Sequence, residues 1–139
     1  MINLTQKELY EIIDSLKPHA KKICDDIYTE TAKEIGDNKQ FKTILDNSFN
    51  PIVEMEIEGL KNYFNTYFSL TNFSEISIEK IIKLISIRGN TYAAQIRRKE
   101  GKILTRGTTA IIHRAATRGF IENLCECLGL DVKEIINYK

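Results

Sequence analysis

The chain has 139 residues and a mass of 16.0 kDa, the size of one domain. With 42% hydrophobic residues, 28% charged residues and a net charge of +1, it is not a disordered, strongly charged chain. Two prolines, seven glycines and three cysteines exclude collagen-like, low-complexity and disulfide-scaffold proteins. The sequence has no run of 18 apolar residues and no signal-peptide pattern, so we expect a cytoplasmic protein without a membrane span.

Charge is unevenly distributed along the chain. Residues 1–60 carry a net charge of −5, whereas residues 81–118 hold nine basic residues and one acidic residue, Glu100, for a net charge of +8. Such a basic segment either meets an anionic partner or pairs with the acidic first half, within the fold or across a dimer. We expect the second arrangement and keep the first as the alternative.

Local signals predict two helices at the start of the chain. Thr5 and Glu8 have the spacing of a capping box, which satisfies free backbone donors where a helix begins. Apolar residues then recur at helical spacing. Pro18 predicts the end of this helix and the first turn of the next, which Gly36 ends as a C-terminal cap.

The middle of the chain predicts a short helix and then a longer one. Apolar residues in 41–45 indicate the short helix. Asn50 and Pro51 predict a new helix start, with asparagine as the N-cap and proline in the first helical position. The longer helix carries an apolar, aromatic-rich stripe over 53–68, and Leu70–Ser77 is expected to form a turn.

Two long helices follow. Residues 76–98 keep one apolar face for about 34 Å at 1.5 Å per residue, and Gly101 ends this helix. Residues 103–129 are apolar over most of their circumference, which predicts cover on more than one side. Asp131 is expected to cap a final helix, and 131–139 to begin a linker. No strand pair with turn chemistry is visible, so the predicted class is all-α.

The sequence holds few chemical motifs. Patterns for nucleotide binding, a metal-binding histidine pair or a nucleophile elbow are absent. Cys125 and Cys127 lie two positions apart, so on a helix they face different directions and are not expected to share a metal. His113 is expected to be a helix-face histidine with a hydrogen-bond partner, and a haem ligand at His113 or His19 is the alternative. We therefore expect no enzyme, no metal and no cofactor.

A basic cluster is expected at the turn between the two long helices. Its members are Arg97, Arg98, Lys99, Lys102 and Arg106. Clusters of this kind bind phosphates, so a small helical nucleic-acid-binding subunit is an alternative function. Aromatic residues are scarce nearby, which argues against a platform for stacking single-stranded bases.

Residues 87–124 resemble the N-terminal sensor domain of RsbR-type stressosome proteins, a family described as non-haem globins. The matching residues are Arg98, Glu100, Gly101, Leu104 and Ala110. Ile111 stands where that pattern has a tyrosine. The resemblance implies a non-enzymatic sensor or scaffold in signal transduction and the stress response, which relays a signal to a protein partner or a downstream domain.

The order of the predicted helices fits this resemblance. Short helices followed by two long antiparallel helices are the layout of a globin. We therefore expect one all-α domain over residues 1–139, a globin-like bundle of six or seven helices ending in the long antiparallel pair. Residues 61–77 contain no histidine in the segment where a globin holds its iron ligand, so this register predicts a globin without haem.

The small and apolar residues of the last long helix favour a homodimer formed through the two long helices. The residues expected at the interface are Tyr92, Ile96, Leu104, Ile111, Ala115 and Phe120. A ligand or partner would favour one packing of the helix pair and so shift the population of states. An inhibitor that acts by binding another protein is a further alternative.

Overall fold

The computed structural model describes residues 2–36, 38–100 and 103–136, without the side chains of 35, 90–100, 103–106 and 136. In chain order, its elements are β1 (Asn3–Thr5), α1 (Gln6–Asp14), α2 (Lys17–Ile35), α3 (Lys39–Thr71), β2 (Glu75–Ser77), α4 (Ile78–Glu100), α5 (Ile103–Leu128) and α6 (Val132–Ile136). The predicted all-α class is confirmed, with one small strand pair added. None of the helices in these ranges is long and apolar enough to cross a membrane.

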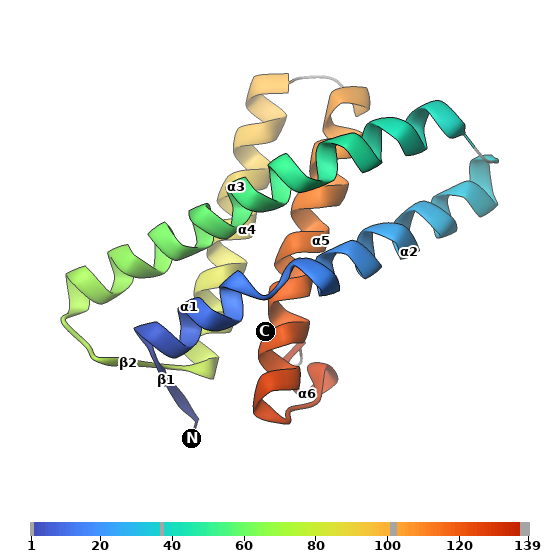
Figure 1. The fold of residues 1–139 in the computed structure, drawn as a ribbon. Coiled ribbons are helices and arrows are strands. Elements are labelled where there is room, and N and C mark those ends of the chain that lie inside the picture. Colours follow the sequence, from blue (N-terminus) through green and yellow to red (C-terminus); the bar gives the residue numbers. More distant parts are fainter. Residues whose placement is uncertain (1, 37, 101–102, 137–139) are drawn as a thin grey trace.

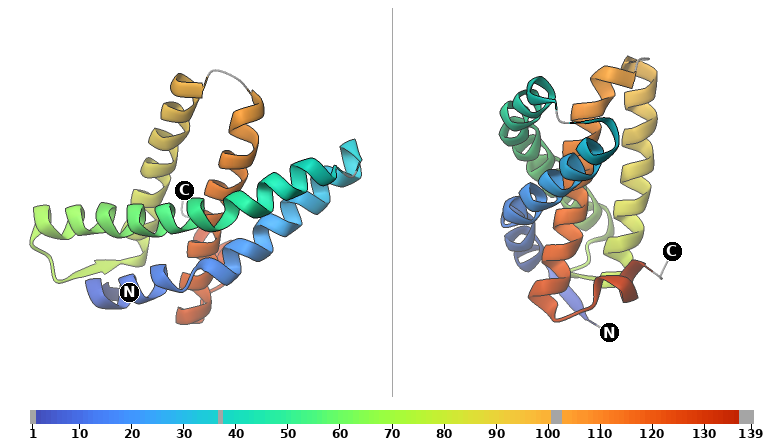
Figure 2. Two further views of the ribbon diagram at one scale, coloured as in Figure 1. Left: turned by 45° about the horizontal axis from the view of Figure 1, so that its top comes forward. Right: turned by 90° about the vertical axis from the view of Figure 1, so that its right-hand side faces the viewer.

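The helices form two crossing layers (Figure 1). In the first layer, α1 and α2 follow one another, and α3 runs back beside them in the opposite direction. In the second layer, α4 and α5 form an antiparallel hairpin (Figure 2). α5 contacts α2 and α3 on one side and α4 on the other, so it is the central helix of the fold.

The predicted helix ends are confirmed where a local cap defines them. Oγ1 of Thr5 accepts a hydrogen bond from the backbone N–H of Glu8 at 3.2 Å, and Oε1 of Glu8 accepts from the N–H of Thr5 at 2.9 Å. α2 ends at Gly36, whose φ of 88° lies in the region that favours glycine. The side chain of Asp131 accepts from the N–H of Lys133 at 2.9 Å where α6 begins.

The predicted helix start at Asn50 and Pro51 is wrong, because both residues lie inside the continuous helix α3. A proline inside a helix removes one hydrogen bond and costs about 3 kcal/mol. The apolar face of α3 nevertheless continues past Pro51 without a change of phase, through Leu45, Phe49, Val53 and Ile57. Burial of this uninterrupted face outweighs the local cost, so the chain does not break there.

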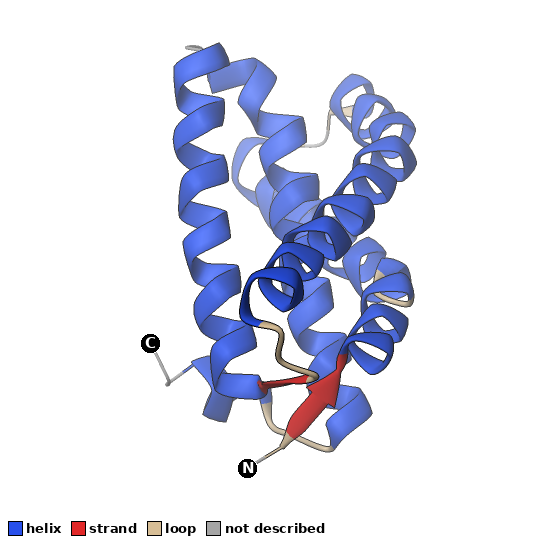
Figure 3. Cartoon of the chain, turned by 90° about the vertical axis from the view of Figure 1, so that its left-hand side faces the viewer, coloured by secondary structure: helices blue, strands red, loops and turns tan. Residues whose placement is uncertain are grey.

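A strand pair that the sequence did not predict ties the N-terminus to the segment after α3 (Figure 3). β1 and β2 are antiparallel, with Leu4 opposite Ile76, and both of these side chains are buried. The residues expected to form a turn, Leu70–Ser77, thus contain the end of α3 and all of β2. Because the two strands lie far apart in the sequence, no hairpin turn marks them.

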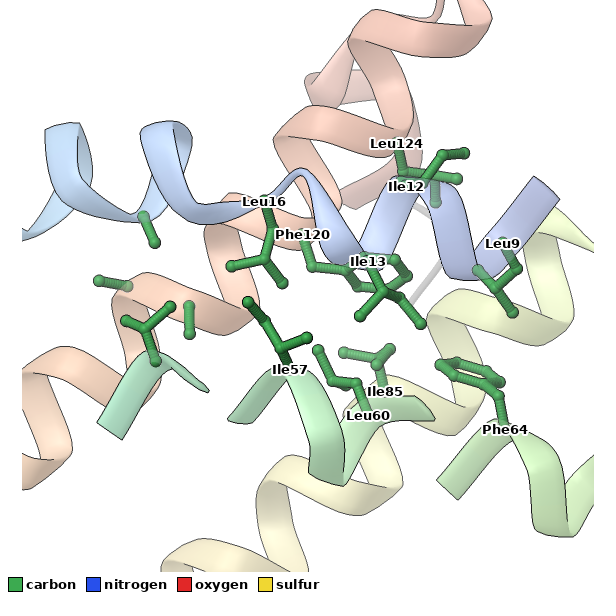
Figure 4. Packing of buried hydrophobic residues seen from close by; sticks show 14 of the residues in the cluster. Leu9, Ile12, Ile13, Leu16, Ile57, Leu60, Phe64, Ile85, Phe120 and Leu124 are labelled. Carbon is green, nitrogen blue, oxygen red and sulfur yellow. The ribbon is translucent and has the colours of Figure 1, made fainter. Parts of the chain in front are cut away.

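The main core lies where α1, α3, α4 and α5 meet (Figure 4). Its largest fully buried side chains include Leu9 and Ile13 of α1, Phe64 of α3 and Phe120 of α5. The rings of Phe64 and Phe120 lie 6.2 Å apart between centroids. This core fixes α5 against the first layer of helices.

A close contact between α2 and α5 completes the packing of the central helix. A Cβ placed on Gly119 would lie 2.7 Å from the backbone nitrogen of Ala20 and 3.0 Å from its Cα. Ala115 and Ala116, on the same helix, are also fully buried. The small residues of α5 therefore allow a helix of the same chain to approach, which explains the predicted cover on several sides.

α6 belongs to the domain. Ile135 is 2% exposed and packs in a second apolar cluster with Ile78 of α4 and Cys125 of α5. Residues 132–136, which were expected to begin a linker, thus pack against both long helices; residues 137–139 lie outside the described part of the chain.

Candidate functional site

Three ionisable side chains from three helices meet below the surface: Glu56 of α3, Arg88 of α4 and His113 of α5. Glu56 is 5% exposed and His113 is 9% exposed. Oε1 of Glu56 pairs with Nη1 of Arg88, and Oε2 of Glu56 lies 2.7 Å from Nδ1 of His113. We call these three residues the shared-carboxylate cluster, since one carboxylate binds basic groups from two other helices.

The face of α3 next to Glu56 is shaped for the guanidinium group of Arg88. Glu56, Gly59 and Tyr63 are three and then four positions apart, so they lie on one side of the helix. A Cβ on Gly59 would lie 2.7 Å from Nη2 of Arg88, so the guanidinium packs directly over this glycine and would have to shift for a larger residue. The ring centroid of Tyr63 lies 5.9 Å from Cζ of Arg88, within cation–π range.

Tyr63 also fixes α4 directly. Its hydroxyl donates a hydrogen bond to the carbonyl oxygen of Leu84 at 2.9 Å. Burial raises the pKa of the Tyr63 hydroxyl, and the positive charge of Arg88 lowers it by a smaller amount. The hydroxyl therefore remains protonated and able to donate at neutral pH.

The charge balance of the cluster depends on His113. A buried ion pair is tolerated when its charges cancel and its remaining hydrogen-bonding atoms are satisfied. The carboxylate of Glu56 and the guanidinium of Arg88 cancel while His113 is neutral. A proton on His113 would leave two positive charges and one negative charge at the junction of α3, α4 and α5.

Two of the six residues predicted at a dimer interface lie inside the monomer. Ala115 and Phe120 are 0% exposed and belong to the main core, so neither can contact a second copy. We correct the prediction for these two. Ile111 is partly buried at the edge of the same core. The side chains of Tyr92, Ile96 and Leu104 lie outside the described residues.

The small-residue face that suggested a dimer has a different role. Gly119 of α5 packs against Ala20 of α2. The sequence pattern indicated correctly that another backbone approaches this face, but the approaching helix comes from the same chain. The apolar circumference of α5 is therefore no evidence for a second copy.

The predicted basic cluster lies at the far end of the hairpin. Arg97, Arg98 and Lys99 are in the last turns of α4, and Arg106 is in the first turns of α5. The hairpin brings these helix ends together, as expected for a cluster at the turn. The side chains of these four residues, and all of Lys102, lie outside the described part of the chain.

Pairing between the basic segment and the acidic first half is present at Arg88 and His113, which both contact Glu56. The other histidine has an acidic neighbour as well, since Nε2 of His19 lies 3.1 Å from Oε2 of Glu126. Among the described residues, no clustered set of three or more histidine, cysteine or acidic side chains suits a metal ion. The two positions considered as haem ligands thus both face carboxylates.

Sequence reasoning missed Glu56 and Arg88 as site residues. The signal that could have identified Glu56 is its position on the apolar face of α3, next to Ile57 and one turn from Val53 and Leu60. A carboxylate within an otherwise apolar face requires a buried partner. That partner comes from α4 and α5, which the sequence alone did not place beside α3.

No family model, curated protein or solved structure matches this chain. Its function is therefore inferred from the shared-carboxylate cluster and from the hairpin that the cluster holds.

Proposed function

We propose that the chain is a non-enzymatic sensor or scaffold domain with a globin-like helix arrangement, which dimerises through the α4–α5 hairpin and relays a signal. The proposal is carried by one observation. The upper part of the hairpin, residues 90–100 of α4 with the first turn of α5, stands beyond the layer formed by α1, α2 and α3 (Figure 2, left). The resemblance to RsbR-type sensor domains supports the same role.

The projecting part of the hairpin needs a partner for physical reasons. Tyr92 and Ile96 continue the apolar face of α4 on which Ile81 and Ile85 are buried, and Leu104 lies at the start of α5. A hairpin of two helices covers such a face from one side only, so a partner can cover it from another. Four helices bury such residues well, and two hairpins supply four. We therefore propose a second copy of this chain as the partner, with Tyr92, Ile96, Leu104 and the partly exposed Ile111 at the interface.

The shared-carboxylate cluster lies at the base of the projecting part. Arg88 is the last residue of α4 with a described ionic contact to the first layer, and His113 makes the matching contact from α5. A change at Glu56 would act on both helices of the hairpin at once. The cluster thus supplies a route by which the body of the domain influences the dimer and a downstream partner.

The cytoplasm is the compartment that we propose. Cys24, Cys125 and Cys127 are all free in the fold. Free thiols suit a reducing compartment. Burial raises the pKa of the thiols of Cys24 and Cys125, which keeps both unreactive.

Oligomeric state tests the dimer proposal. We expect light scattering to give twice the chain mass for the wild type, and the mass of one chain for Ile96→Glu. Met55→Glu is the matched control, because Met55 is 73% exposed on the outward face of α3, and this variant should remain dimeric. A monomeric wild type at high concentration, or a dimeric Ile96→Glu variant, would reject the proposal.

The nucleic-acid alternative is favoured by the placement of basic residues at one end of the hairpin. If that end bound a phosphate backbone, the logarithm of affinity would fall linearly with the logarithm of salt concentration, by about 0.7 to 0.9 per phosphate contacted. Charge reversal at Arg97 and Arg98 should then remove binding to a labelled oligonucleotide. Affinity that is weak and independent of salt would exclude this role.

A further inference from the structure

Glu56 lies between two basic groups, the guanidinium of Arg88 and the imidazole of His113. Arginine stays charged at every ordinary pH, and histidine side chains commonly titrate between about pH 5 and pH 8. We propose that the shared-carboxylate cluster is a proton-sensitive latch: protonation of His113 draws Glu56 toward α5 and weakens its hold on Arg88 of α4. This inference concerns regulation of the hairpin and rests on the proposed function for its biological meaning.

In the latched state, His113 is neutral. Its Nδ1 lies 2.7 Å from Oε2 of Glu56, while Oε1 of Glu56 carries the ion pair with Arg88. The charges of Glu56 and Arg88 cancel, which is the condition under which a buried pair is tolerated. α4 is then held against α3 by this pair and by the hydrogen bond from Tyr63 to Leu84.

In the protonated state, Glu56 faces two cations. Its attraction to His113 rises because the imidazole now carries a full charge. The cluster as a whole gains one uncompensated positive charge, and burying such a charge is costly. Arg88 is the member that can leave, since its side chain is 17% exposed, whereas those of His113 and Glu56 are 11% and 5% exposed. The predicted response is a looser contact between α3 and α4, with α5 still attached.

Other charged groups do not replace Glu56 at His113. On α2, Lys22, Asp26 and Glu30 face α5 across a groove that also contains Arg118 and Glu122. Position 118 is five residues after His113, so it lies about 140° around the helix from it. On α5 itself, Arg114 is exposed. The charged group described in contact with His113 is Glu56 of α3, and Arg88 of α4 pairs with the same carboxylate.

The distance between α3 and α4 tests the latch. Spin labels on Asn62→Cys of α3 and Lys83→Cys of α4, both exposed positions, report this distance in a Cys127→Ser background. Mixing the labelled protein with an excess of unlabelled protein suppresses the signal from pairs of labels in different copies. From about pH 8 to about pH 5, we expect the distance distribution to shift to longer values and broaden. A distribution that does not change with pH would overturn the proposal.

The two histidines provide a matched pair of variants. His113→Gln should abolish the pH response, because glutamine keeps a polar side chain but takes up no proton. His19→Gln should retain it, since His19 contacts Glu126 in the last turn of α5. An undiminished response in His113→Gln would overturn the proposal. Both spin labels are in the same chain. A monomeric protein would therefore contradict the proposed dimer, but the distance between the labels would still test the latch.

A measurement on the unaltered protein covers the case in which His113→Gln fails to fold. The ring signals of His113 and the guanidinium signals of Arg88 can be followed by NMR across the same pH range. The latch requires both sets to move with one titration curve while the fold persists. Movement of the His113 signals without those of Arg88, or no movement of either, would overturn it.

Discussion

Replacing Gly119 with alanine tests the close contact between α2 and α5. The added Cβ would lie 2.7 Å from the backbone nitrogen of Ala20, 3.0 Å from its Cα and 3.2 Å from its Cβ. Two of these three atoms belong to the backbone, so a side-chain rotation cannot relieve the clash. The helices must separate by a few tenths of an ångström or more, and their packing on both sides is disturbed.

Two opposing terms determine the size of this effect. Overpacking a well-packed core costs about 1–3 kcal/mol. Alanine in place of glycine inside a helix gains about 1 kcal/mol. Gly89→Ala in α4 isolates the second term, because nothing lies within 4 Å of a Cβ at that position. We therefore expect Gly119→Ala to be less stable than Gly89→Ala by about 1–3 kcal/mol.

Urea unfolding followed by circular dichroism measures both variants. The two curves are compared at equal slope, since a changed slope would indicate an altered denatured state. If Gly119→Ala is as stable as Gly89→Ala, α2 does not approach α5 as closely as described. The small-residue face of α5 would then again be free to contact a second copy of the chain.

Three further variants test other contacts. Glu56→Gln should destabilise the fold by about 3–5 kcal/mol, because it leaves two buried basic groups without their anion. The exposed Glu54→Gln should cost no more than about 1 kcal/mol, and equal costs would refute a buried cluster. Asn123→Ala removes the buried hydrogen bonds that Asn123 donates at the junction of α1 and α2, so the free energy of unfolding in urea should fall by about 1–3 kcal/mol. A change outside this range would contradict these hydrogen bonds. Glu8→Gln should lower the urea midpoint less at pH 3 than at pH 7. The backbone N–H of Thr5, and then its side chain, donate hydrogen bonds that lower the pKa of the Glu8 carboxyl, so this stabilisation is complete above the unfolded-state pKa and is lost as pH falls through the folded-state pKa. An equal effect of Glu8→Gln at both pH values would contradict this.

Helix boundaries with a local chemical cause could be predicted from the sequence. The capping box at Thr5, the glycine at the end of α2 and the aspartate before α6 each act within a few residues. Pro51 shows where local reasoning fails. Its cost inside a helix is a local quantity, but the burial that offsets this cost comes from α1, α2 and α5. The strands β1 and β2 escape prediction because they stabilise each other only when paired.

The candidate site required the tertiary arrangement. His113 could be singled out as a histidine in an apolar helix, and its Nδ1 lies 2.7 Å from the carboxylate of Glu56. The identity of that partner depends on how the hairpin crosses α3, which no periodicity encodes. The predicted interface failed at Ala115 and Phe120 for a related reason. Small and apolar residues indicate contact with another helix, but not whether that helix belongs to the same chain.

The location of the dimer contact tests the central claim most directly. A single spin label on Gln95→Cys, in the projecting part of α4, can be compared with one on Thr66→Cys, which is exposed on α3, both in a Cys127→Ser background. We expect a well-defined distance between the two labels of a dimer at position 95 and a longer one at position 66. Dimerisation through the α4–α5 hairpin would be contradicted if neither position gave a dipolar coupling between spin labels of two copies. It would also be contradicted if the distance between labels were shorter at position 66 than at position 95.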